Sequence, residues 1–189
     1  MSDVWIEIQP PSMDPDLDVV VVDCFTAEDL ARTSPDAMIS IWDVGTYPKE
    51  KYPWTQAPGI LVLEFDDVVR DLPDHGYVAA RPYDVKPALD LAPTLRGRLA
   101  IHCAAGISRS SAMTVVVFAA RFGPGREHDA VRAMLVAVDR TRLRGWRSGS
   151  VHPNRLVVEI ADELLDRDGA LLAALDEVLA DVDEWRNPP

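Results

Sequence analysis

The chain has 189 residues, of which 48% are hydrophobic, and it carries a formal net charge of -12 at pH 7. This length supports one sizeable α/β core and is short for two. The negative charge argues against nucleic acid or an anionic membrane as a partner, because both would repel the chain. Two cysteines are too few for a disulfide scaffold. The opening stretch "MSDVWIEIQPPSMDPDLD" lacks the basic and apolar regions of a secretion signal, and apolar runs such as "MTVVVFAA" are far shorter than the roughly 18 residues of a membrane helix. We therefore expect a cytoplasmic protein with reduced thiols.

Short β-like runs alternate with helical patterns along the chain. "DVVVVD" (18–23) is β-branched and continuous, as in a parallel strand covered on both faces, and "TAEDLART" after it predicts a helix capped by Thr26. Further strands are predicted at 37–42, 59–65 and 98–103, and further helices at 84–96, 109–122, 126–141, 154–166 and 170–185. This alternation predicts an α/β fold with a central, mostly parallel sheet of four to five strands flanked by helices. We expect one domain over 18–185, preceded by a flexible N-terminal segment over 1–17.

One strand-to-helix junction carries reactive side chains. In "AIHCAAGISRS" (100–110), Cys103 ends a predicted strand and Arg109 begins a buried helix six residues later. Ligands of parallel sheets bind at such junctions, because the amides of the first helical turn are unpaired and the helix dipole is positive there. Small residues let the backbone of 104–109 approach an anion, and Gly106 can take a positive φ. We therefore predict a loop that holds a phosphate dianion between the Arg109 guanidinium and the thiolate of Cys103.

The same residues carry a family resemblance. The segment from His102 to Ser110 resembles the His-Cys-x5-Arg-Ser/Thr signature of the protein tyrosine phosphatase superfamily, and its ending is similar to the dual-specificity branch. "FDDV" (65–68) and "HPNRLVVEIADELLDRDG" (152–169) resemble segments of small bacterial members, so the likeness covers roughly residues 18 to 175. It implies a phosphatase-like domain and a two-step reaction in which a cysteine attacks phosphorus, an aspartic acid protonates the leaving oxygen, and water hydrolyses the phosphocysteine.

The resemblance assigns a role to each residue of the loop. Cys103 would be the nucleophile, and Arg109 would bind the phosphoryl oxygens. Ser110 would ease departure of the thiolate, although it is also a plain N-terminal helix residue. His102 would support the loop, and a hydrogen-bonded core histidine is the simpler description, so no proton transfer is assigned to it. The remaining substrate-binding positions are Ala104, Ala105, Gly106, Ile107 and Ser108.

The general acid lies outside this loop. Asp66, Asp67, Asp71 and Asp74 all follow the third predicted strand, where the superfamily places this residue. "FDDV" aligns with the bacterial pattern by its second aspartate, so Asp67 is the choice and Asp66 the alternative. Asn154, in "HPN", matches an asparagine that steadies the catalytic loop in the family, and it also fits a helix N-cap.

Two other features have a functional and a structural interpretation. "RTRLRGWR" (140–147) holds four arginines that could attract a second anionic group of a substrate, although favourable charge at a helix C-terminus is the simpler account. Cys24 could resolve an oxidised Cys103, but a cysteine at a strand end is more often a packing residue.

The expected function is a cysteine-dependent phosphatase for phosphotyrosine, with phosphoserine and phosphothreonine as further substrates. One alternative is a phosphoinositide or other small phosphoester phosphatase, although relatives of that kind favour lysines in the loop and this loop has none. Another is a phosphate-binding module with little turnover. The partner would be a phosphorylated protein or a small phosphoester, with no nucleic acid and no membrane. No cofactor or metal is expected, because the histidines show no ligand spacing and no Cys-x-x-Cys motif occurs.

Overall fold

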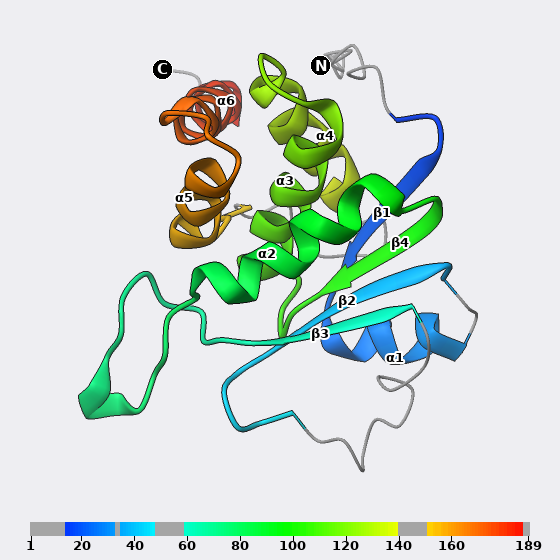
Figure 1. The fold of residues 1–189 in the computed structure, drawn as a ribbon, viewed down its shortest axis with the longest axis vertical. Helices are drawn as coiled ribbons and strands as arrows, with labels where there is room; N and C mark the ends of the chain where they lie inside the picture. Colours follow the sequence, from blue (N-terminus) through cyan, green and yellow to red (C-terminus); the bar gives the residue numbers. More distant parts are fainter. Residues whose placement is uncertain (1–13, 33–34, 48–58, 140–150, 187–189) are drawn as a thin grey trace.

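A computed structural model of the chain describes residues 14–32, 35–47, 59–139 and 151–186. Within these ranges, a four-stranded sheet forms the centre (Figure 1). Its strands are β1 (Leu17–Val22), β2 (Ala37–Trp42), β3 (Ile60–Glu64) and β4 (Gly97–His102). Their order is β1-β4-β2-β3, and every pair of neighbours is parallel. The predicted α/β class with a parallel sheet of four to five strands is therefore confirmed.

Helices cover both faces of the sheet. One face carries α1 (Cys24–Arg32), which packs on a small apolar cluster of β1, β2 and β4 residues. The other face carries α2 (Pro82–Leu91), α3 (Arg109–Phe122) and α4 (Glu127–Asp139), with α5 (Arg155–Leu164) and α6 (Ala170–Arg186) packed against these helices (Figure 1). Two short 3-10 helices, η2 (Pro73–His75) and η3 (Ala92–Thr94), lie in the connections on either side of α2.

The larger core lies between the sheet and the five helices, and α3 runs through its middle. Every residue of α3 from Arg109 to Ala119 is buried, as the apolar sequence of this segment predicts. The helix contacts β1, β4, α2, α4 and α5. Because the first turn of α3 is enclosed on so many sides, the loop that precedes it is held in a fixed place.

The predicted cap of the first helix is wrong. The helix begins at Cys24 rather than at Thr26, because the Asp23 carboxylate accepts a hydrogen bond from the Thr26 amide (2.7 Å). An aspartate binds the free amides of a first turn as well as a threonine does. The helix thereby starts directly beside the end of β1, next to the catalytic loop predicted above.

The strand ends gather the predicted site residues at one edge of the sheet. Val22 of β1 lies opposite His102 of β4 on one side, and Ser40 of β2 lies opposite it on the other. The segments that leave these strands begin at Asp23, Asp43 and Cys103. No helix in the described part of the chain is long and apolar enough to cross a membrane. "RTRLRGWR" lies outside the described residues, as does most of the segment predicted over 1–17.

Candidate active site

The loop between β4 and α3 is anchored by its carbonyl groups. Four of these carbonyls accept hydrogen bonds from the structure around the loop. The pairs are His102 Nδ1 to Cys103 O (3.4 Å), the Cys24 amide to Ala104 O (3.3 Å), the Ser111 hydroxyl to Ile107 O, and the Asn154 amide to Ser108 O (3.2 Å). In a trans peptide the N–H points away from the C=O. Fixing these carbonyls outward therefore turns the amides that follow them toward the concave side of the loop, where they can bind an anion.

Gly106 lets the loop pack against the end of β1. Its φ is +68°, in the left-handed region that side chains disfavour. A Cβ at this position would lie 2.8 Å from both the carbonyl carbon and the oxygen of Val22. The loop therefore needs glycine here both for its backbone conformation and for space.

The Cys103 thiol lies at the floor of the loop. It is 2% exposed, and its Sγ lies 3.3 Å from the hydroxyl oxygen of Ser110, which is itself buried. The alanines that follow, Ala104 and Ala105, are exposed. The two residues that directly follow the thiol therefore present small side chains.

The Arg109 guanidinium is fixed by one of its nitrogens. Nη1 donates to the Phe65 carbonyl (2.8 Å) and pairs with Asp43 Oδ1 (2.7 Å). Arg109 is 3% exposed, yet its Nε has no hydrogen-bond partner among the described residues. A buried N–H without a partner costs about 1 to 3 kcal/mol of folding free energy, and the cost is larger when the group is charged. An oxyanion at this position would accept the hydrogen bond from Nε. Sequence reasoning did not identify Asp43, whose signal was only its place directly after β2.

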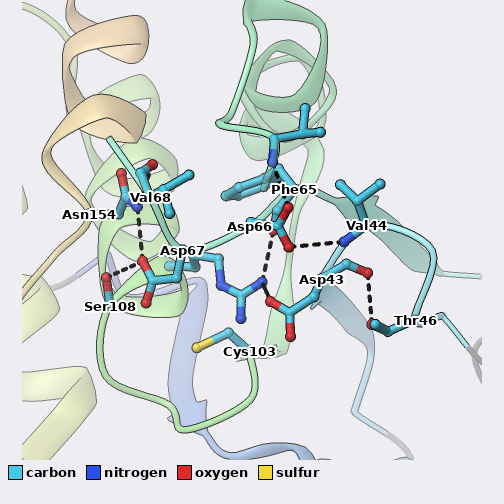
Figure 2. Close-up of polar contacts among 12 residues, drawn as sticks. Asp43, Val44, Thr46, Phe65, Asp66, Asp67, Val68, Cys103, Ser108 and Asn154 are labelled. Carbon is cyan, nitrogen blue, oxygen red and sulfur yellow. Dashed lines mark hydrogen bonds and ion pairs between the residues drawn. The ribbon is translucent and has the colours of Figure 1, made fainter. Parts of the chain in front are cut away.

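The two adjacent aspartates point to different places (Figure 2). Asp66 is 5% exposed, and its two oxygens accept hydrogen bonds from the amides of Val44 (3.3 Å) and Val78 (2.7 Å). Asp67 instead lies at the loop between β4 and α3, where its Oδ1 accepts from the Ser108 hydroxyl (2.6 Å) and from Asn154 Nδ2 (2.9 Å). Asp66 thus joins three backbone segments, and Asp67 faces the loop that carries the thiol.

The other acids of this segment are placed for structure. The Asp71 carboxylate accepts from the Ala79 amide (2.9 Å) and pairs with Arg81. The Ala79 bond, followed by that with Arg81, lowers the pKa of Asp71, so this carboxyl is poorly suited to donate a proton. Asp74 lies in η2, which has no buried residue.

Asn154 connects three parts of the site. Its Oδ1 accepts from the Val157 amide (3.3 Å), which makes it the N-cap of α5. Its Nδ2 donates to Asp67, and its own amide donates to Ser108 O. The side chain is therefore a helix cap, and it also holds the candidate acid next to the loop between β4 and α3.

His102 lies behind the thiol and is fully buried. Its Nε2 lies 2.7 Å from the Ser40 hydroxyl oxygen, and its Nδ1 faces the Cys103 carbonyl. Burial lowers the pKa of His102 to about 4, so the ring is neutral near pH 7.

Cys24 is close to the loop through its backbone, since its amide donates to Ala104 O. Burial, and then the charge of Asp23, raise the pKa of the Cys24 thiol, which makes it a weaker nucleophile at neutral pH. Its role as a resolving thiol stays a prediction.

The sequence matches no family profile and no curated protein. Among solved structures, the chain is similar to Tk-PTP in its active form, with a TM-score of 0.46 and 16% identity over 82% of this chain and 94% of that one. It is also similar to the Yvh1 phosphatase domain from Chaetomium thermophilum (TM-score 0.45, 19% identity) and to PTPMT1 (TM-score 0.45, 15% identity), each over 82% of this chain and 94% of the other.

Proposed function

We propose that the protein is a cysteine-dependent phosphatase that hydrolyses phosphotyrosine, and also phosphoserine and phosphothreonine, through a phosphocysteine intermediate. The observation that carries the proposal is the unpartnered Nε of the buried Arg109, on a loop whose carbonyls are bound outward and whose floor is the Cys103 thiol. A buried guanidinium and backbone amides that surround a nucleophile bind a phosphoryl group better than any neutral ligand, because its oxygens are negatively charged.

In the first step, the Cys103 thiolate attacks phosphorus, so that an S–P bond forms as the bond to the leaving oxygen breaks. Arg109 and the loop amides bind the phosphoryl oxygens, on which charge develops. Asp67 gives its proton to the leaving oxygen. Since Asp67 Oδ1 already accepts two hydrogen bonds, from Ser108 and Asn154, the proton is carried on Oδ2.

In the second step, the ionised Asp67 takes a proton from a water molecule that attacks the phosphocysteine. The S–P bond breaks and Cys103 leaves as a thiolate. The Ser110 hydroxyl, 3.3 Å from Sγ, donates a hydrogen bond to the sulfur as its negative charge returns, which lowers the barrier to departure.

The decisive experiment compares variants at three positions on two substrates: a tyrosyl phosphate and an aryl phosphate with a very acidic leaving group. Cys103→Ser should abolish turnover of both, because a hydroxyl is far too weak an acid to serve as the nucleophile here. Asp67→Asn should lower kcat by roughly 10²- to 10⁴-fold on tyrosyl phosphate, and by much less on the acidic aryl phosphate, which departs without protonation. The decrease of kcat/KM toward high pH should also be weaker in Asp67→Asn, because this variant has no acid to lose its proton.

Asp66→Asn is the matched control. Its side-chain amide would face a backbone N–H with another N–H, so it should destabilise the fold by about 1 to 3 kcal/mol while the dependence on the leaving group stays that of the wild type. If Asp66→Asn and not Asp67→Asn shows the loss that depends on the leaving group, the general acid is Asp66. Turnover by Cys103→Ser within tenfold of wild type would exclude the cysteine mechanism. If the wild type binds phosphate but hydrolyses neither substrate, the protein is a phosphate-binding module.

A further inference from the structure

A series of hydrogen-bonded polar groups connects β2 to the catalytic loop. The indole Nε1 of Trp42 donates to the Ser40 hydroxyl oxygen (2.6 Å), and that hydroxyl lies 2.7 Å from Nε2 of His102. The other ring nitrogen of His102 faces the Cys103 carbonyl oxygen (3.4 Å). Ser40 and His102 are both 0% exposed, and the Trp42 ring meets the imidazole edge-on with centroids 5.6 Å apart.

The directions of these hydrogen bonds follow from the two ends of the series. At one end an indole N–H can only donate, so the Ser40 oxygen accepts from Trp42. At the other end the Cys103 carbonyl can only accept, so His102 Nδ1 donates to it. A neutral imidazole that carries its proton on Nδ1 has an acceptor at Nε2. The Ser40 hydroxyl therefore donates to Nε2.

We infer that Ser40 and Trp42 are positioning residues that hold His102 in its Nδ1–H tautomer, and that this tautomer fixes the peptide between Cys103 and Ala104 with its N–H toward the bound phosphoryl group. The carbonyl of that peptide is bound on one side, so its amide projects to the other. Donation to a carbonyl also polarises the peptide and strengthens the hydrogen bond that its N–H makes, by about 10 to 30%.

Burial keeps His102 in its neutral Nδ1–H form near neutral pH. With its pKa lowered to about 4, His102 stays neutral, and Nε2 remains an acceptor. A protonated ring would bring a second N–H toward the Ser40 hydroxyl and reverse that hydrogen bond. The charged groups that bear on the ring are Asp23 and Arg109, whose effects on the His102 pKa oppose each other and are smaller than that of burial.

The inference concerns the proposed phosphatase site, but its test does not depend on turnover. In protein labelled with ¹⁵N-histidine, the nitrogen shifts of His102 report which ring nitrogen carries the proton. The wild type should show protonated Nδ1 and unprotonated Nε2. Tungstate, a tetrahedral dianion that mimics phosphate, measures anion binding by the loop in the same samples.

Ser40→Ala removes the hydroxyl with little change in volume. We expect His102 to shift toward the Nε2–H form or a mixture, and tungstate affinity to fall by about 3- to 10-fold, the usual worth of one hydrogen bond. Trp42→Phe keeps an aromatic ring against the imidazole but removes the N–H, so the Ser40 hydroxyl can turn and both tautomers should be present. Ser40→Thr keeps the hydroxyl and should keep the wild-type tautomer.

Three results would overturn the inference. The first is a wild-type His102 with its proton on Nε2, and the second is a Ser40→Ala variant whose tautomer and tungstate affinity are those of the wild type. A shifted tautomer with unchanged tungstate affinity would also reject it, because the peptide would then be fixed by other contacts. A wild type that shows the expected tautomer and tungstate response but hydrolyses no phosphoester would reject the proposed function and leave the positioning role intact.

Discussion

The buried imidazole of His102 makes folding stability depend on pH in a narrow range. Its pKa is about 4 in the folded protein and 6.5 in an exposed histidine. Between these values the unfolded chain binds a proton that the folded protein does not bind, so stability falls as pH falls. The contribution is fully present above 6.5 and is lost as pH decreases toward 4. From these two pKa values, lowering the pH from about 7.5 to about 5 should cost about 2 kcal/mol of unfolding free energy through this one group.

The assay is urea unfolding of the wild type and of His102→Gln at both pH values, followed by circular dichroism. Other titrating groups are the same in the two proteins, so their contributions cancel in the difference between the two pH dependences. The variant should be less stable at neutral pH, because it disturbs a buried hydrogen-bonded site, yet it should lose about 2 kcal/mol less on acidification. Equal losses in the two proteins would show that His102 is not buried in its neutral form, and the reasoning would fail.

The remaining predictions concern the loop and its frame. Gly106→Ala should lower both tungstate affinity and kcat/KM by at least tenfold, because its Cβ would lie 2.8 Å from the β1 backbone. Gly76→Ala is the control, because Gly76 has a similar φ of +72° but open space around its Cβ. It should cost only the backbone strain, about 1 to 2 kcal/mol of stability. If Gly76→Ala lowers kcat/KM as much as Gly106→Ala does, the contact of the new Cβ with β1 is not the cause. Arg109→Lys should lose roughly 10²-fold or more in kcat despite keeping its charge, since an ammonium cannot replace the fixed guanidinium; near-normal kinetics would make the arginine structural. Asp162→Asn should destabilise the protein by about 1 to 3 kcal/mol, because this carboxylate accepts from two backbone amides at 2.6 and 2.7 Å, and kinetics at a temperature where it is folded should not change.

Local patterns were sufficient to predict the sheet and its helices. Short β-branched runs are typical of buried strands, and the longer apolar segment after Arg109 is typical of a buried helix. The structure confirms the parallel sheet and the buried α3. Element ends were less well determined. α1 starts at Cys24 because the Asp23 carboxylate outcompetes the threonine as a cap, a choice between two suitable residues that sequence alone cannot make.

The motif from Cys103 to Arg109 is contiguous, so the sequence by itself determined that a thiol, small residues and a guanidinium share one loop between a strand and a helix. Which aspartate faces that loop depended on tertiary structure, because the two are adjacent in the sequence. Asp66 accepts from the backbone amide of Val78, whereas Asp67 accepts from the Ser108 hydroxyl of the loop. Tertiary structure also determined which residues contact Arg109 and His102. Asp43 and Ser40 lie about sixty residues earlier in the chain and meet them only because β2 pairs with β4 in parallel, which brings the carboxyl ends of the two strands to the same edge of the sheet.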